Sequence, residues 1–159
     1  MPDPFDVLGV AARFDLEAKA LEKAHLQVIR GAHPDHLGDR GAAEQAAALS
    51  RAADANDAYR TLKAPWDRAK ALAERMEPGV LKRHEKPDPA FLMEVMELRE
   101  EVESAIGEAE EAARQKLQSQ LRQLLDQIAE AFRSSYVESA AKTIHRGGYF
   151  RQALARLDG

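Results

Sequence analysis

The sequence predicts an all-α protein, a helical hairpin followed by an antiparallel three-helix bundle. Its composition is rich in alanine, leucine, glutamate, glutamine and arginine, all of which favour helices. No alternating apolar run of useful length and no cluster of β-branched residues indicates a strand. The segment 78–89 holds three prolines and no apolar period, so it is expected to separate two helical units.

The first unit is expected to contain the helical hairpin. A short apolar segment, Phe5–Val10, comes first. Asp15 is of the residue type that caps helices, so a helix should follow it and run to about Gly31. The remaining elements are a long helix from about Ala42 to Ala64 and, after Pro65, a shorter one over Trp66–Met76.

The second unit begins with Asp88-Pro89, which combines a good N-cap with proline at the first helical position. Three helices with short turns are expected over residues 89–106, 108–133 and 136–157, and they predict an antiparallel bundle. The glycine pair at 147–148 should weaken or kink the last helix. The expected organisation is a first domain over residues 1–76, a linker over 77–88 and a second domain over 89–159.

The tripeptide His33-Pro34-Asp35 lies between the two long helices of the first unit. Pro34 has no amide hydrogen and a fixed φ, so the first helix must end there. His33 and Asp35 are therefore expected at the tip of the turn between two antiparallel helices. There they would present a small, rigid, charged surface to another protein.

The helix before this turn has two distinct faces at about 100° per residue. Its core stripe is expected to consist of Leu21, Ala24, Val28 and Ala32. On the opposite side, a basic stripe runs toward the turn and consists of Lys19, Lys23 and Arg30. A solvated face is the ordinary explanation of such a stripe. Beside His-Pro-Asp it favours docking on an acidic protein surface.

The first helix of the second unit also has two apolar faces. The core stripe has spacings of four, three, four and four residues and consists of Phe91, Val95, Leu98, Val102 and Ile106. Three further apolar residues, Leu92, Met93 and Met96, lie on the outer side beside Glu97 and Glu100. Exposed apolar residues on one face usually mark a contact site, and methionines suit an adaptable protein-binding surface. Alternatively, a thicker bundle would bury Leu92.

Composition excludes several classes of function. A net charge of −4 argues against a nucleic-acid partner, because phosphate binding favours a basic excess. The absence of cysteine excludes disulfides, thiolate zinc sites and direct cysteine ligation of an iron–sulfur cluster. The N-terminal sequence MPDPFDVLGV lacks the features of a signal or transit peptide, and no segment resembles a membrane span. We therefore expect a cytoplasmic protein with no membrane partner.

Three segments together resemble the HscB family, the co-chaperones of iron–sulfur cluster assembly. The His-Pro-Asp tripeptide between helices marks a J domain. Residues 56–72, NDAYRTLKAPWDRAKAL, look like the end of the J domain in that family. Residues 90–105, AFLMEVMELREEVESA, are similar to the first helix of the family's C-terminal domain. The resemblance covers almost the whole chain.

The resemblance implies an L-shaped molecule with an N-terminal J domain, a short linker and a C-terminal three-helix bundle. It implies that the J domain docks on a DnaK-type chaperone, called HscA in many bacteria, and stimulates its ATP hydrolysis. It also implies that the bundle binds the cluster scaffold protein, IscU, and delivers it to that chaperone. The outcome would be cluster transfer and maturation of iron–sulfur proteins.

The resemblance also implies roles for particular residues. Those expected to bind the chaperone are His33, Pro34 and Asp35, supported by Lys19, Lys23 and Arg30. Those expected to bind the scaffold are Leu92, Met93, Met96, Glu97, Glu100 and Phe150, the last of which matches an aromatic residue on the family's last helix. Two positions depart from the family pattern. Ala32 stands where a bulky aromatic is common, and His36 where lysine or arginine is usual.

The favoured function is therefore an adaptor with no catalytic site, metal or cofactor of its own. The alternative within this class is a J-domain adaptor that delivers a different client to a general DnaK-type chaperone. A metal-dependent enzyme using His33, Asp35 and His36 is disfavoured, because Pro34 breaks the helical i, i+3 geometry and no further ligand cluster lies nearby. A long coiled coil is disfavoured because the prolines at 65, 78, 87 and 89 cut the helices short.

Overall fold

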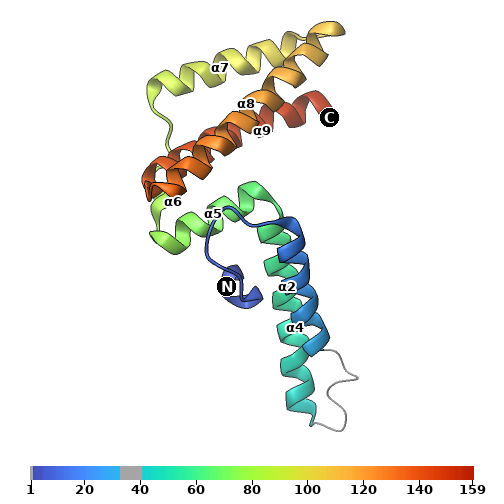
Figure 1. Cartoon of the computed structure of the whole chain (residues 1–159). Helices are drawn as coiled ribbons and strands as arrows, with labels where there is room; N and C mark the ends of the chain where they lie inside the picture. The colour runs from blue at the N-terminus through green and yellow to red at the C-terminus, as the bar shows by residue number, and fades with distance from the viewer. Residues whose placement is uncertain (1, 33–40) are drawn as a thin grey trace. The chain divides into compact units, whose positions relative to one another are not determined.

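The computed structural model describes residues 2–32 and 41–159, and within these ranges it contains helices and no strand (Figure 1). The prediction of an all-α protein is therefore confirmed. The chain divides into two compact units, residues 1–75 and 76–159.

The first unit is built around two long helices that lie side by side (Figure 1). Its elements are α1 (Pro4–Leu8), α2 (Ala18–Gly31), α4 (Ala42–Lys63) and α5 (Pro65–Met76). The prediction that Asp15 caps α2 is wrong, because the N-cap is Glu17 and α2 begins at Ala18. Phe14 is buried just before this start, and the Leu16 amide donates to its carbonyl over 2.9 Å. The helix thus begins two residues later than the capping pattern suggests.

At the end of α2, the contact with α4 is made by small side chains. Ala32 at the end of α2 packs against Ala48, with Ala52 beside them. Small side chains let two helix axes approach closely. The buried positions of α4, which include Ala55 and Ala58, continue the same pattern. An alanine at position 32 therefore matches the alanines that face it.

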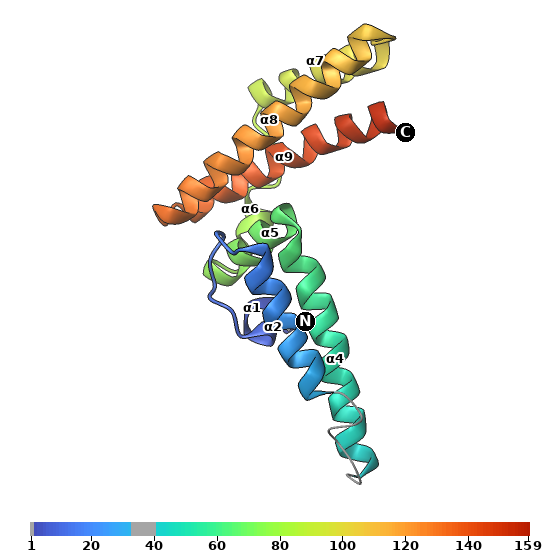
Figure 2. The same ribbon diagram turned by 45° about the vertical axis from the view of Figure 1, so that its right-hand side comes forward.

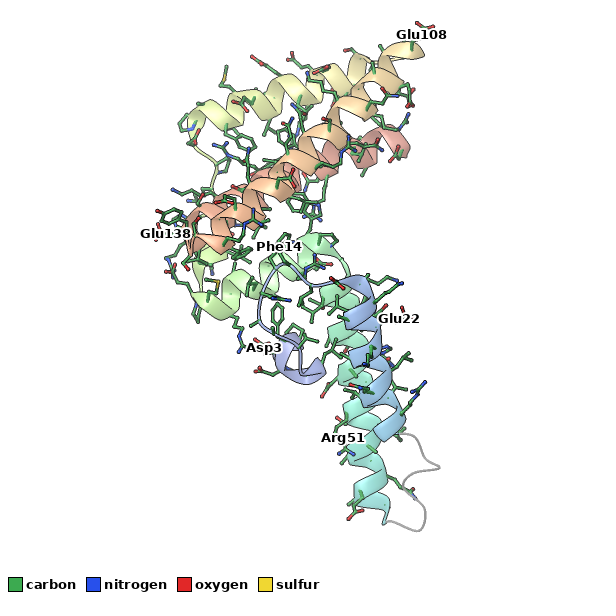
Figure 3. The ribbon with its side chains drawn as sticks, viewed as in Figure 1. Asp3, Phe14, Glu22, Arg51, Glu108 and Glu138 are labelled. Carbon is green, nitrogen blue, oxygen red and sulfur yellow. The ribbon has the colours of Figure 1, made fainter. Side chains whose placement is uncertain are left out.

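Two arginines fix the shorter segments of this unit. Arg75 on α5 lies 3.1 Å from an Asp3 carboxylate oxygen and 2.9 Å from one of Asp6, at the start of α1 (Asp3 is labelled in Figure 3). The hydrogen bond to Asp6, followed by that to Asp3, raises the pKa of Arg75 above its ordinary value. Arg68 donates to the Leu62 carbonyl over 2.8 Å and lies 5.0 Å from the centre of the Phe14 ring. Its burial lowers the pKa of Arg68.

The second unit contains a short helix and three long ones (Figure 2). They are α6 (Val80–Arg83), α7 (Pro89–Ser104), α8 (Glu108–Arg133) and α9 (Val137–Asp158). The long helices alternate in direction, α8 and α9 share the most extensive contact, and α7 packs more on α9 than on α8. This arrangement is the antiparallel three-helix bundle that the sequence predicts.

The segment expected to be a linker contributes to the core of the second unit. It contains α6, and the side chain of Val80 is fully buried. The Nε2 atom of His145 on α9 lies 2.6 Å from the Leu81 carbonyl oxygen, which can only accept, so the ring nitrogen donates. Sequence periodicity does not reveal a four-residue helix, because one turn is too short to show a period.

The two ends of α7 give different outcomes. At its start, the Asp88 carboxylate accepts the Phe91 amide over 2.8 Å and Pro89 occupies the first turn, which confirms the predicted N-cap. At its end, the assignment of Ile106 to the core is wrong, since α7 stops at Ser104 and Ile106 is 81% exposed. A residue beyond the last turn no longer follows the helical period. The predicted turn at Gly107 is confirmed by its positive φ of 62°.

Helix α9 runs without interruption through the glycine pair at 147–148, which the sequence predicts to weaken or kink it. Gly147 is buried, as are Ala140, Ala141 and Ile144 on the same helix. Tertiary packing along α8 supplies the stability that the glycines lack, because most helical stability in proteins comes from a buried face.

The burial of Val80 makes it a test of whether α6 belongs to the second unit. We expect Val80→Ala to lower the free energy of unfolding by about 1–3 kcal/mol, through lost apolar burial and a residual cavity. Urea unfolding followed by circular dichroism measures this loss. The control is Ile106→Ala, at an exposed position of the same unit, which should change the stability by less than about 0.5 kcal/mol. Equal effects of the two substitutions would contradict the packing of α6.

Candidate functional site

The basic stripe of α2 lies on the exposed side of the hairpin. Lys19, Lys23 and Arg30 are all exposed, and Leu26 among them is exposed as well. The opposite face holds buried Leu21, in agreement with the predicted phase of the helix. The stripe therefore offers three cations and an apolar side chain to a partner, which suits an acidic surface with an apolar centre.

His25 lies between the two faces and joins α2 to α4. Its Nε2 atom is 2.8 Å from the Oδ1 atom of Asn56, and its ring stacks on Tyr59 with the ring centres 4.5 Å apart. These contacts give His25 the structural role that its position beside the core stripe suggests. They fix α2 against α4 on the approach to the His-Pro-Asp segment.

The residues expected to contact the chaperone most directly, His33, Pro34 and Asp35, lie outside the described residues, and so does His36. The described residues on either side of this segment are Ala32, which is buried at the C-cap of α2, and Gly41, the N-cap of α4. Among the residues that are described, no group of three or more histidine, aspartate or glutamate side chains is arranged to hold a metal ion.

The outer face of α7 carries a patch of large apolar side chains. The exposed fractions are 46% for Leu92, 60% for Met93 and 55% for Met96. By contrast, Phe91 and Val95 on the inner face are only 4% and 3% exposed. The alternative in which a thicker bundle buries Leu92 is therefore wrong. We call Leu92, Met93 and Met96 the methionine patch.

Acidic residues accompany the methionine patch on the same helix. Glu97 and Glu100 are both exposed, as the helical phase predicts. The outer face of α7 therefore combines flexible apolar side chains with carboxylates. This composition suits a partner surface that is apolar with cations around it. Neither glutamate has an ion-pair partner among the described residues.

Phe150 on α9 contacts α7, the helix that carries the methionine patch. It is half-buried on α9, packs against the core cluster of Val102, Leu117 and Ala153, and meets the Phe91 ring edge-on. The centres of these two rings are 6.1 Å apart. Part of the Phe150 side chain thus belongs to the core, and only the remainder is available to a partner. Its contribution to binding stays a prediction.

Sequence reasoning missed a hollow beside the start of α7. Its lining includes Arg83 and Lys86 from the α6–α7 connection and Lys142 and Arg146 from α9. The two pairs are about 60 residues apart in the sequence and follow no common period, so only the fold brings them together. The local signals are the basic residues of the run at 82–86 and the pair Lys142 and Arg146, one turn apart on α9.

The comparisons with known proteins agree in both sequence and fold. The family model described as the HSCB C-terminal oligomerisation domain matches residues 87–158. A co-chaperone protein HscB homolog from Bordetella parapertussis is 36% identical over 97% of this chain and 92% of its own length. An iron–sulfur cluster co-chaperone protein HscB homolog from Arabidopsis thaliana is 30% identical over 98% of this chain and 62% of its own length.

A solved structure supports the same fold. The chaperone HscB from Vibrio cholerae is 30% identical, has a TM-score of 0.78, and is matched over 99% of this chain and 96% of its own. Within the described residues, no helix has both the length and the apolar character needed to cross a membrane.

The exposure of the methionine patch can be tested through stability alone. We expect the double substitution Leu92→Ser, Met96→Ser to change the free energy of unfolding by less than about 0.5 kcal/mol, because neither side chain is buried in the fold. The inward-facing neighbour Phe91→Ala should cost about 3–5 kcal/mol. Thermal unfolding followed by circular dichroism distinguishes the two. A large loss in the double variant would mean that the patch packs inside the bundle.

Proposed function

This chain belongs to the HscB family of co-chaperones, and we propose that it couples an iron–sulfur scaffold protein of the IscU type to a DnaK/HscA-type chaperone. On this proposal the N-terminal J domain stimulates the ATPase of the chaperone. The C-terminal bundle binds the scaffold, and the complex assists cluster transfer and maturation of iron–sulfur proteins. We also propose that the chain acts in the cytoplasm and contributes no catalytic residue, metal or cofactor of its own.

The chaperone side of the proposal is supported by the sequence of the loop and by the helices that flank it. His33, Pro34 and Asp35 supply the tripeptide that marks J domains. The exposed cations Lys19, Lys23 and Arg30 extend the charged surface along α2. A row of cations favours encounter with an acidic surface on the chaperone, and the Asp35 carboxylate can pair with a cation there.

The methionine patch is the observation that supports scaffold binding most directly. Three large apolar side chains are exposed together on α7, whereas Phe91, Val95 and Val102 on its inner face are buried. Buried apolar anchors supply most of the binding energy of protein interfaces, and an adaptable methionine surface fits a partner without precise prior complementarity. The Glu97 and Glu100 carboxylates would pair with cations at the rim of such a contact.

The proposed mechanism is an increase in local concentration and not a covalent step. When one chain binds both the chaperone and the scaffold, the second binding event becomes effectively intramolecular. The scaffold is then presented to the chaperone while the J domain promotes ATP hydrolysis, which couples client capture to the nucleotide cycle. Simultaneous binding of chaperone and scaffold requires two separate surfaces. The two proposed surfaces are separate because α2 and α7 lie in different units of the chain.

The alternative is a J-domain adaptor that delivers a different client to a general DnaK-type chaperone. The two proposals share the role of His33, Pro34 and Asp35 and differ only in what the methionine patch binds. Binding of an IscU-type scaffold to the full chain, measured by titration calorimetry, distinguishes them. The relative from Arabidopsis thaliana is described as an iron–sulfur cluster co-chaperone, which favours the scaffold.

The chaperone-stimulating role is tested by Asp35→Asn, which removes a negative charge and keeps the shape of the side chain. We expect steady-state ATPase stimulation of the DnaK/HscA-type chaperone to be abolished, because the carboxylate no longer pairs with a cation of the chaperone. The helical circular dichroism and the affinity for the scaffold should be unchanged, and they serve as controls. Stimulation at the wild-type level would overturn the assignment.

The scaffold-binding role is tested by Leu92→Ala together with Met96→Ala. We expect scaffold binding to weaken by roughly 1–3 kcal/mol in titration calorimetry, the range of residues that anchor an interface. The matched control is Ile106→Ala, which removes an exposed apolar side chain beyond the end of α7. If the double variant binds as tightly as the control, the methionine patch does not bind the scaffold.

Light scattering of the same variants addresses a second occupant of the patch. The matched family model is described as an oligomerisation domain, so a second copy of this chain could cover the same side chains. A fall in molar mass in the double variant, with scaffold affinity unchanged, would assign the patch to self-association.

A further inference from the structure

A half-open pocket of about 220 Å³ lies within the second unit, between the α6–α7 connection and the middle of α9. A volume of that size holds roughly seven water molecules and falls below that of a typical site for a whole small-molecule ligand. It suits one or two inserted side chains.

The charge of the pocket differs in sign from that of the chain. Four of its lining residues are cationic and two are anionic, which leaves a net charge of +2 with the histidines neutral, whereas the whole chain has −4. The cations are Arg83, Lys86, Lys142 and Arg146, and the anions are Glu85 and Asp88. A cation excess in a concave site raises the local concentration of anions.

The arginines of the pocket already have partners within the second unit. Arg83 is paired with the Glu77 carboxylate and donates to the Pro78 carbonyl over 3.3 Å. Arg146 lies 5.0 Å from the centre of the Phe91 ring, and a guanidinium nitrogen is 3.9 Å from a carboxylate oxygen of Asp88. That oxygen is not the one that caps α7, so Asp88 both starts the helix and orients Arg146.

The two lysines of the pocket, unlike its arginines, have no ion-pair partner among the described residues. Lys86 and Lys142 are exposed, and no carboxylate among the described residues forms an ion pair with either. Around them, His84 has its Nε2 atom 3.9 Å from a carboxylate oxygen of Glu138, which Figure 3 labels near the start of α9. His145 is already bonded to the Leu81 carbonyl. The two ammonium groups are therefore the charges that remain available to a ligand.

The pocket adjoins the region proposed to bind the scaffold. Phe91 forms part of the pocket wall, and its ring meets both Tyr149, another wall residue, and Phe150 edge-on. The ring centres are 5.6 Å and 6.1 Å apart. Leu92 follows Phe91 directly on α7. The methionine patch and the basic pocket thus both begin at the first turn of α7.

We infer that this pocket receives an acidic segment of the protein that covers the methionine patch, with a glutamate or aspartate side chain between Lys86 and Lys142. The inference rests on the proposed scaffold-binding function and adds a second, electrostatic anchor to it. The carboxylate enters beside the aromatic wall, where the ammonium groups of the two lysines replace its water. Such contacts supply specificity and encounter rate more than affinity.

The test uses the full chain with Lys86→Gln and Lys142→Gln combined, two exposed positions whose change leaves the core intact. We expect scaffold binding in titration calorimetry to weaken roughly three- to tenfold, the range for two exposed ion pairs. The effect should shrink as salt rises from about 0.05 to 0.5 M, because screening weakens such pairs. The matched control is Lys70→Gln with Lys82→Gln, which changes net charge equally at exposed positions that do not line the pocket.

A second measurement does not depend on the scaffold. Amide chemical shifts of the labelled full chain are followed during titration with an acetylated, amidated tetraglutamate peptide, and separately with inorganic phosphate at equal ionic strength. We expect the peptide to shift amides within residues 84–88 and 142–149 of the wild type and not of the double lysine variant. Phosphate should have a weaker effect on the same amides.

The two measurements separate the inference from the function on which it rests. Scaffold binding that is unaffected by the lysine substitutions, with no peptide-induced shifts, overturns the pocket and leaves the scaffold function standing. Absence of scaffold binding, with peptide shifts at the pocket, overturns the proposed function and supports an acidic ligand. Shifts caused by phosphate as strongly as by peptide overturn the inference in favour of a small-anion site.

Discussion

The phase of α7 is the constraint on which the second unit depends. A helix repeats every 3.6 residues, so burying Phe91, Val95 and Val102 against the bundle fixes the direction of every other side chain on it. Asp88 sets where this phase begins, because its carboxylate accepts the amide of Phe91. Exposure of the methionine patch is then a consequence of core packing. The core behind α7 thus positions the backbone that carries the surface proposed to bind the scaffold, while the methionine side chains on it stay adaptable.

The charges of the chain are separated into distinct surfaces. Cations follow the outer side of α2, carboxylates accompany the methionine patch, and a cation excess lines the pocket beside α9. The net charge of the whole chain, −4, therefore does not give the charge of any one of these surfaces. For a protein proposed to hold two partners, this separation has a physical advantage. Like charges discourage each partner from the wrong surface, and opposite charges speed encounter with the right one.

Patterns that rest on several repeats of a helical period predicted the structure well. The stripe from Phe91 to Val102, the N-cap at Asp88 and the turn at Gly107 all follow from such local rules. The predictions that are wrong lie where a local rule meets its limit. Ile106 continues the spacing past the end of α7, and Asp15 has the type of a cap but precedes a turn closed at the buried Phe14.

The sequence by itself determined the helical class, the face of α7 that is exposed, and the residues that carry the family resemblance. These depend on local spacing and on residue type, which need no knowledge of distant contacts. Only the tertiary structure decided that α6 joins the second unit, that α9 continues through its glycines, and that four cations meet around one pocket. Each of these features depends on contacts between segments that are far apart in the sequence, and a pattern within one segment does not predict such contacts.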